Sequence, residues 1–244
     1  MYNPVSSSRG GAVFSNSYAL THPSQPNYIE LFSGSNQGVT DNQIPVQPIK
    51  APSLGGQLFA AGLSFAGYAE SLPAPGSLVE QEGPYVRRHN PWSNFADVPP
   101  SANLPFTHFP ADFSELPTVS FVVPNLINDM HDASIEVGDR WLRDNLGAYA
   151  QWAQTHNSLL IVTFDEGLGS LHIPTIFYGQ PVQPGVYTER IDHHRVLRTV
   201  EDMYGLAPLG AAANVAPITP VSRKPDDAGR SRTPFEFLPH PVRS

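Results

Sequence analysis

Proline sets the first limit on what this chain can fold into. The 26 prolines concentrate between residues 41 and 117 and again after residue 207. Proline has no backbone N–H and a fixed φ angle, so neither a helix nor a central strand continues through such stretches. We therefore expect both parts of the chain to run as long irregular connections over a core that other segments build.

Three short apolar runs predict the buried strands. They cover residues 118–123, 159–164 and 173–178 and are rich in β-branched and aromatic residues. Their near-continuous apolar character, without strict alternation, favours parallel strands covered on both faces. Between the first two, residues 134–154 place apolar side chains on one helical face, as a crossover helix would. The sequence therefore predicts a βαβ unit and an α/β fold.

The remaining patterns outline one domain. Residues 192–204 form a second amphipathic pattern that Gly205 ends, and a short helix is expected at 28–32. With 40% apolar residues, the chain has enough material for a full core. We place the domain at residues 1–217 and a loose tail, rich in proline and arginine, at 218–244.

Charge and cysteine content exclude several classes of function. The net charge is −8 and the 14 lysines and arginines are spread thinly, which argues against a nucleic-acid partner. The chain has 0 cysteines, so any metal must be held by oxygen and nitrogen ligands. No apolar run approaches the roughly 20 residues of a transmembrane segment. Residues 1–11 are polar and do not form a signal peptide.

Ser24 is a candidate nucleophile. The run THPSQPNY at residues 21–28 places it between two prolines, just before the predicted helix. Amides at a helix start hold phosphate oxygens, and the Asn27 side chain would donate a further hydrogen bond. Serine between prolines is also a common turn or cap residue. The turn alone leaves both interpretations open.

Asp165 and Glu166 form the strongest acidic candidate. They end the apolar run that begins at residue 159. Two adjacent carboxylates repel each other unless a cation or solvent offsets them, and a divalent metal ion is the natural cation. The alternative is that Asp165 caps the following turn while Glu166 lies in solvent.

A second polar segment, NLINDMHD at residues 125–132, follows the first predicted strand. Its Asp129, His131 and Asp132 are suited to bind a metal or to protonate a leaving group. Alternatively, these residues open the next helix as an N-cap cluster.

Further histidines complete the candidate set. His193 and His194 stand at a helix start, where a neutral, hydrogen-bonding or metal-binding imidazole is favoured. His172 precedes the third predicted strand, and a purely structural role is the alternative for each. The run RRHNPW at residues 87–92 adds two guanidinium groups and His89. These would bind an anionic substrate, or the run is a surface loop.

Six segments occur in a recognisable order. They are NSYALTHPSQPNYIELFSGSNQGVTD, YVRRHNPW, LPTVSFVVPNLINDMHD, NSLLIVTFDE, HIPTIFYG and HHRVLRTVEDMYGL. Together they resemble the bacterial phosphoesterase family that includes acid phosphatases and phosphatidylcholine-type phospholipases C. The resemblance covers residues 11–217, and six ordered segments are far more specific than any one of them.

The resemblance implies an alkaline-phosphatase-like, three-layer α/β/α fold with a metal held by acidic residues. By the same matching, Ser24 resembles the nucleophile, Asn27 the amide beside the phosphate, and Asp165 and Glu166 the metal ligands. His131, His193 and His172 resemble residues that line the pocket. From these matches and the residue patterns above, we expect the catalytic residues to be Ser24 and His131, the substrate-binding residues Asn27, Asp129, His172 and His193, and the metal ligands Asp165 and Glu166.

The chain also departs from that family. Members begin with a strand that ends in an acidic residue and Asn, and those two side chains complete the metal site. Here the chain enters only a few residues before the Ser24 turn, so we expect the first strand and one or two ligands to be missing. After Glu166 the sequence continues as GLGSL, without further acidic residues. Both departures are expected to weaken binding of the metal.

The leading hypothesis is a metal-assisted, acid-phosphatase-like phosphoester hydrolase with a phosphoseryl intermediate on Ser24. Its substrate would be a phosphorylated small molecule or a phospholipid head group, and its cofactor a divalent metal ion. Two alternatives remain open: a truncated, catalytically silent homologue that binds anions, or a phospholipase C-type phosphodiesterase. The family is commonly periplasmic or extracellular, but nothing in this chain would direct export.

Overall fold

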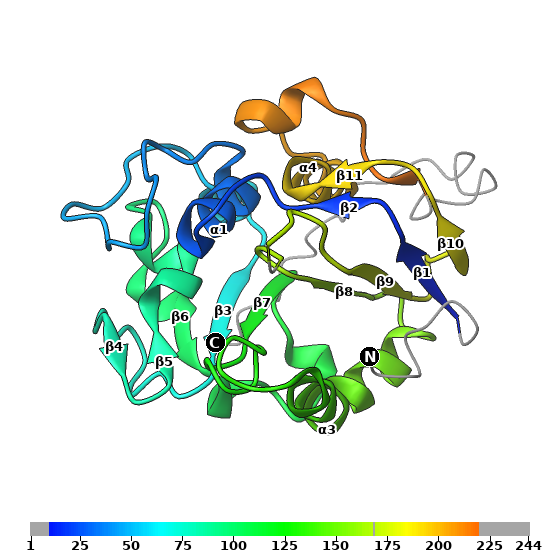
Figure 1. The fold of residues 1–244 in the computed structure, drawn as a ribbon, viewed down its shortest axis with the longest axis horizontal. Helices are drawn as coiled ribbons and strands as arrows, with labels where there is room; N and C mark the ends of the chain where they lie inside the picture. The colour runs from blue at the N-terminus through cyan, green and yellow to red at the C-terminus, as the bar shows by residue number, and fades with distance from the viewer. Residues whose placement is uncertain (1–9, 168, 220–244) are drawn as a thin grey trace, which may run out of the picture.

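The computed structural model describes residues 10–167 and 169–219. Within them the strands form two main sheets (Figure 1). The four-stranded sheet has the order β10-β1-β9-β8, and the three-stranded sheet has the order β6-β3-β7. The strands of the first are β10 (Gly185–Tyr187), β1 (Gly11–Phe14), β9 (Thr175–Gly179) and β8 (Leu159–Thr163). Those of the second are β6 (Asn103–Pro105), β3 (Phe65–Ala69) and β7 (Val119–Val123).

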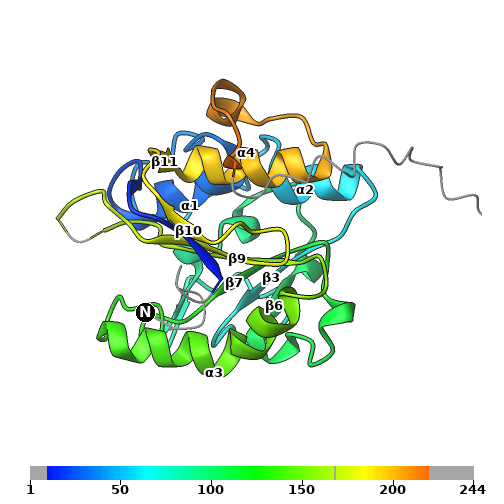
Figure 2. The ribbon, with the colours of Figure 1, turned by 90° about the vertical axis from the view of Figure 1, so that its right-hand side faces the viewer.

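Helices cover both sides of the strands. Figure 2 shows α3 (Ile135–Ala153) on one side, and α1 (Ser24–Ser33), α2 (Leu54–Ala60) and α4 (His193–Tyr204) on the other. Two short pairs, β2 (Ser17–Tyr18) with β11 (Ile191–Asp192) and β4 (Gln81–Glu82) with β5 (Tyr85–Val86), lie outside the main sheets. The predicted α/β class is therefore confirmed. The alkaline-phosphatase-like arrangement stays a prediction.

The predicted helices and strands were found close to their expected bounds, but their connection was partly wrong. β8 and β9 run antiparallel, with Leu160 opposite Tyr178. β7 lies in the other sheet, parallel to β3. The described residues of the connection 164–174 contain no helix, and a parallel return needs a crossover of a dozen or more residues. The prediction that the three strands run parallel in one sheet, with the first two forming a βαβ unit, is thereby corrected.

The proline-rich stretch holds a central strand that we did not expect. β3 is buried at all five positions, and α2 precedes it. Both lie between Pro52 and Pro73, a window without proline. Proline therefore limited the lengths of these elements without preventing them.

Helix ends follow the sequence signals. Gly205, in the left-handed region with φ 66°, closes α4 by donating its N–H to the carbonyls of Asp202 and Glu201. α1 is longer than the expected 28–32, because it already begins at Ser24. Most of the predicted tail lies outside the described residues, and Gly210–Asn214 just before it forms a 3-10 helix.

The core lies in two main clusters on the side of α1 and α4. One packs α1, α2 and β3 around Trp92, with Phe32 and Phe65 in edge or tilted ring contacts. The other packs Phe14 and Phe177 beneath α4. Together they fix α1, and with it Ser24, over the carboxyl end of β8.

β7 and β8 each leave one side without a strand partner among the described residues. Every position of both strands is partly exposed, whereas every position of β3 and β9 is buried. No described strand links the two sheets by backbone hydrogen bonds. The molecule therefore has a seam between β7 and β8, which we call the inter-sheet seam.

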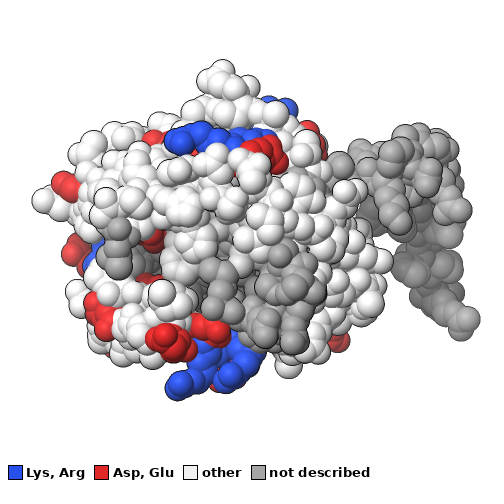
Figure 3. Space-filling view, turned by 45° about the vertical axis from the view of Figure 1, so that its right-hand side comes forward, with Lys and Arg blue, Asp and Glu red and all other residues white. Residues whose placement is uncertain are grey.

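The described helices and the visible surface add two observations. None of the helices in residues 10–167 and 169–219 is both long and apolar enough to cross a membrane. On the face in Figure 3, lysine and arginine side chains lie beside acidic ones and most of the surface is uncharged. That face carries no continuous basic stripe in its described part.

Candidate active site

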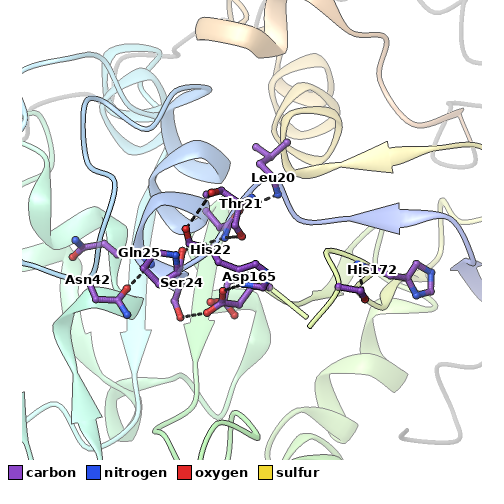
Figure 4. Close-up of polar contacts among 12 residues, drawn as sticks. Leu20, Thr21, His22, Ser24, Gln25, Asn42, Asp165 and His172 are labelled. Carbon is purple, nitrogen blue, oxygen red and sulfur yellow. Dashed lines mark hydrogen bonds and ion pairs between the residues drawn. The ribbon is translucent and has the colours of Figure 1, made fainter. Parts of the chain in front are cut away.

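Ser24 is the first residue of α1 and is 3% exposed. Pro23 precedes it as the N-cap residue of α1, in an extended conformation. The Ser24 Oγ donates a hydrogen bond of 2.5 Å to Glu166 Oε1. Figure 4 shows Ser24 directed toward the acidic side chains that follow β8. The structure therefore brings together the two segments that the sequence analysis ranked first.

Glu166 also contacts a residue that sequence reasoning missed. Its second oxygen, Oε2, pairs with His22 Nδ1. The His22 side chain is 46% exposed, so solvent and ligands reach it. His22 stands two positions before Ser24 in the run THPS. That proximity was the only available signal, because the contact with Glu166 depends on the fold.

Asp165 is held at the bottom of the site. Burial raises the pKa of its carboxyl, and the negative charge of Glu166 raises it further. The His89 charge and a hydrogen bond from Ser24 act in the opposite direction. Asp165 therefore binds a proton more readily than an exposed aspartate does.

His193 holds the backbone at this point. Its Nε2 donates a hydrogen bond of 2.8 Å to the Asp165 carbonyl oxygen. The ring is fully buried, and burial lowers its pKa. Its other nitrogen, Nδ1, is buried without a hydrogen-bond partner among the described residues. The structure thus places a neutral, hydrogen-bonding His193 behind the carboxylates, and its predicted contact with substrate stays a prediction.

Asn27 holds the turn that presents Ser24. Its Oδ1 accepts hydrogen bonds from the backbone N–H groups of Leu20, at 3.0 Å, and Thr21, at 3.1 Å. Its Nδ2 donates to the carbonyl oxygens of Thr21, at 2.8 Å, and Pro23, at 3.3 Å. The whole amide is used inside the protein. Asn27 therefore positions Ser24 here, while its predicted hydrogen bond to phosphate has no free donor in this conformation.

Residues of the loop after β7 form a further side of the site. Asp129 Oδ2 pairs with His89 Nδ1 at 3.1 Å, and the His89 ring stacks on Tyr28 with centroids 5.1 Å apart. Burial raises the Tyr28 pKa well above its usual value, and the charges of Asp165, Asp129 and Glu166 raise it further. The acidic residues of both loops therefore surround the Tyr28 hydroxyl.

His131 lies at the rim of this side of the site. Its side chain is 47% exposed and its Nδ1 pairs with Asp132 Oδ1 at 2.7 Å. The rings of His131 and His89 are 6.1 Å apart. The alternative interpretation, in which Asp132 caps the next helix, is wrong because Ser134 is the N-cap of α3.

Two candidate histidines lie elsewhere. His172 is exposed, and its Nε2 pairs with the Ser15 carbonyl oxygen at 2.9 Å. Figure 4 places it apart from Ser24. His194 pairs with Glu30 at 2.7 Å on the other side of α1. The structure does not bring either residue to Ser24, and it gives no support for binding of substrate by His172.

A metal site needs more ligands than this cluster offers. Metal sites in proteins usually have three or more protein ligands. Within the described residues, no group of three or more His, Asp or Glu side chains lies close enough to hold a metal ion. Asp165 and Glu166 alone supply two carboxylates, and both Glu166 oxygens already have partners. These residues do not fit a metal site by themselves.

The two adjacent arginines of the RRHNPW run differ in role. Arg87 is a structural residue, since its guanidinium donates to the Leu78 carbonyl at 3.2 Å, to Ser93 Oγ at 3.3 Å and to the Ser93 carbonyl at 2.9 Å. The Arg88 side chain forms no hydrogen bond or ion pair with the described residues, and its Nε is buried. Its positive charge acts on the Tyr28 hydroxyl, so it lies at the edge of the candidate active site.

Comparisons with known proteins give the site its context. Residues 5–207 match the model of the Phosphoesterase family. A protein named phosphatidylinositol-3-phosphatase from Mycobacterium tuberculosis is 52% identical over 215 residues, which cover 86% of this chain and 72% of that protein. An acid phosphatase from Aspergillus fumigatus is 29% identical over 222 residues, 82% of this chain and 50% of that protein.

Two further matches extend this context. A phosphate-repressible acid phosphatase from Penicillium chrysogenum is 32% identical over 170 residues, 64% of this chain and 41% of that protein. The chain thus spans about half or less of the two fungal relatives. Among solved structures, the crystal structure of Ps i-CgsB in complex with k-i-k-neocarrahexaose aligns with a TM-score of 0.51 at 12% identity. That alignment covers 86% of this chain and 67% of the other, and it bears on the fold alone.

Proposed function

The chain belongs to the phosphoesterase family of phosphoester hydrolases, and we propose that it hydrolyses phosphate monoesters with Ser24 as nucleophile. One observation carries the proposal: the Ser24 hydroxyl donates to the Glu166 carboxylate at 2.5 Å in a buried position. A nucleophile beside a base that its own neighbour orients is the usual arrangement of covalent catalysis. Here His22 is that neighbour, since it contacts the other Glu166 oxygen.

The first step transfers the phosphoryl group to the enzyme. Ser24 Oγ bonds to phosphorus while Glu166 accepts its proton, and the bond from phosphorus to the leaving oxygen breaks. His131, at the exposed rim, gives its proton to the leaving alkoxide. Water then attacks the phosphoseryl group, Ser24 takes its proton back from Glu166, and the proton from water returns to His131. Inorganic phosphate leaves, and every group regains its starting state.

Only part of the helix start is available to hold phosphate. The Gln25 backbone N–H donates to Asn42 Oδ1 at 3.0 Å, and residue 26 is a proline without an N–H. Residues 25 and 26, in the first turn of the helix, therefore offer no free backbone N–H group to a phosphate. The substrate phosphate therefore depends on side-chain cations as well as on the helix start.

The test replaces the nucleophile. Ser24→Ala should lower release of phosphate from an aryl phosphate at least about 1,000-fold, because no other described hydroxyl is hydrogen-bonded to Glu166. Ser33→Ala is the matched control. Ser33 is buried at the other end of the same helix and donates to Ile29, so this variant should keep its activity. Equal rates for wild type and Ser24→Ala would end the proposal.

The phosphoseryl intermediate has its own test. Acid quenching during turnover should trap phosphate on the peptide that contains Ser24, which peptide mass spectrometry detects. A trapped phosphate on any other residue would contradict Ser24 as the nucleophile. A wild type that turns over no phosphate ester would instead favour the silent, anion-binding homologue.

The divalent metal ion stays a separate proposal. It rests on the family resemblance, with Asp165 and Glu166 as ligands, and no step above depends on it. The measurement is phosphate release after dialysis against a chelator and after addition of divalent ions one at a time. Activity that disappears with chelation and returns with one ion would support the metal; activity that chelation leaves unchanged would refute it.

For the fold, we propose the alkaline-phosphatase-like α/β/α class. The helix layers on both sides of the strands in Figure 2 support it. The substrate proposal follows the mycobacterial relative, which is named for a phosphorylated inositol lipid. We therefore place a phosphorylated polyol head group among the first substrates to assay.

A further inference from the structure

A cavity lies beside the nucleophile turn and is not used by the chemistry above. It has a volume of about 420 Å³, enough for the polar part of a small substrate. Its lining is polar and comes from two loops. The lining residues are Asn42, Gln43, Ile44, Glu80, Gln81 and Arg88.

One wall of the cavity is tied directly to the residue after Ser24. Gln25 is fully buried and its Nε2 donates to the carbonyl oxygens of Asp41, at 3.0 Å, and Gln43, at 2.7 Å. Its backbone N–H donates to Asn42 Oδ1. Figure 4 shows Gln25 and Asn42 beside Ser24. This wall of the cavity is therefore hydrogen-bonded to the residue that follows Ser24.

The opposite wall supplies a positive charge without a counter-ion. Arg88 has a buried Nε with no hydrogen-bond partner, and it forms no ion pair with a described residue. A buried donor without an acceptor is costly unless a ligand supplies one. The adjacent His89 stacks on Tyr28, which holds the Arg88 backbone close to the acidic cluster.

The charges around Ser24 explain why such a cation is needed. Asp165, Glu166 and Asp129 place negative charge where a phosphate dianion must bind, and like charges repel. Among the cavity residues, only Arg88 is positively charged. Glu80 is the opposing charge there, but it is exposed and solvent screens it. The balance favours an anion at Arg88.

We propose that this cavity is the leaving-group subsite, and that Arg88 binds a second phosphate carried by the alcohol that leaves. Guanidinium groups bind phosphate through two parallel hydrogen bonds, which makes Arg88 a specificity residue for bisphosphorylated substrates. The Asn42 and Gln43 side chains line the same cavity and are exposed, so they are available to bind the hydroxyl groups of a polyol. The inference rests on the proposed function, since the ester to be cleaved is the one at Ser24.

The kinetic test compares two substrates on three proteins. The substrates are an aryl monophosphate and an inositol bisphosphate. The three proteins are wild type, Arg88→Gln and Arg143→Gln, with Arg88→Lys as a fourth, conservative variant. Arg143 is the matched control, because it pairs with Asp144 on the exposed face of α3. For Arg88→Gln, the ratio of kcat/KM for the bisphosphate to kcat/KM for the aryl phosphate should fall roughly 10- to 100-fold. Arg143→Gln should keep the wild-type ratio, and Arg88→Lys should recover part of it.

A binding measurement separates this inference from the proposed chemistry. Calorimetry with inositol bisphosphate on Ser24→Ala, with and without Arg88→Gln, needs no turnover. A Kd that rises at least about tenfold in the double variant supports the subsite, even if Ser24 proves not to be the nucleophile. An unchanged Kd, or an unchanged kinetic ratio with a folded protein, overturns the subsite and leaves the proposed function standing.

The same phosphorylated head group can be free in solution or attached to a lipid. A further assay therefore uses the same head group attached to diacylglycerol and incorporated into phosphatidylcholine vesicles. It is run in parallel with the assay of the soluble inositol bisphosphate. Equal dependence on Arg88 in both forms supports the subsite and identifies the head group as the recognised part. A rate on vesicles that does not depend on Arg88 contradicts the subsite for the lipid form.

Discussion

At the scale of single residues, Glu166 accepts from Ser24 with one oxygen and contacts His22 with the other. Replacing it tests whether the carboxylate acts as a base. Glu166→Gln keeps the shape but accepts a proton far less readily, so kcat should fall about 100- to 10,000-fold. His22→Ala removes only the orienting contact and should cost less. A Glu166→Gln rate within about twofold of wild type would mean that another group takes the Ser24 proton.

His193 gives the site a pH-dependent contribution to stability. Burial lowers its pKa from 6.5 in the folded state, so below that value the unfolded chain binds more protons. Its contribution to the free energy of unfolding is therefore complete above pH 6.5 and is lost as pH falls toward the folded pKa. Asp165, with a raised pKa, acts in the opposite direction above pH 3.8.

The measurement is urea unfolding at several pH values. Wild type should lose stability between about pH 7.5 and 5.5, with a slope from this residue of at most about 1.4 kcal/mol per pH unit. His193→Gln, which keeps an N–H donor, should have a shallower slope there and the same slope above pH 7.5. Identical slopes throughout would show that His193 is accessible to protons in the folded state.

Residues whose roles follow from local sequence could be predicted, and those whose roles depend on a distant partner could not. Ser24, Asp165 and Glu166 each stand at the end of a strong local pattern, and the structure brings them together. His22 has no such pattern, since its partner is 144 positions away. His172 had the pattern of a site residue, but its position beside the β1–β2 turn is set by tertiary contacts.

At the scale of elements, periodicity over a long segment was the most dependable signal. α3 and α4 were found at their expected bounds because each repeats its apolar face over several turns. β3 was missed because its five residues include a central glycine, Gly67, and no alternation. The direction of β9 was also wrong, since an apolar run of five residues carries no information on its partners.

Gly67 has a packing role that can be tested. A Cβ at this position would meet the Trp92 ring at 2.0 Å. Gly67→Ala should therefore lower the free energy of unfolding by about 1–3 kcal/mol or more, as measured by urea unfolding. Gly185→Ala is the matched strand control, because the nearest atoms to its Cβ would be those of the Tyr187 side chain, at 3.4 Å, an ordinary contact distance. A Gly67→Ala protein as stable as Gly185→Ala would mean that Trp92 moves without cost.

At the scale of the whole molecule, the inter-sheet seam predicts uneven protection of the backbone. Outward-facing amides of β7 and β8 have no strand partner among the described residues, so they should exchange with solvent at least about tenfold faster than those of β3 and β9. Hydrogen exchange followed by mass spectrometry measures this directly. Equal protection of all four strands would show that the open sides of β7 and β8 are covered in solution.

Strand order belongs to the same scale. It is a property of the assembled sheets and not of any one segment, so the sequence could not show that β7 and β8 would each have an open side among the described residues.

The seam also divides the active site into two mechanical halves. Asp165 and Glu166 follow β8 on one side, while Arg88 and Asp129 belong to the β3 and β7 side. Ser24 goes with the second half, because α1 packs against β3 in one core cluster and Tyr28 of α1 stacks on His89. Small sliding of one sheet past the other would therefore change the distance from the Ser24 hydroxyl to Glu166, and the chemical step would respond to temperature, denaturant or a bound partner before the protein unfolds.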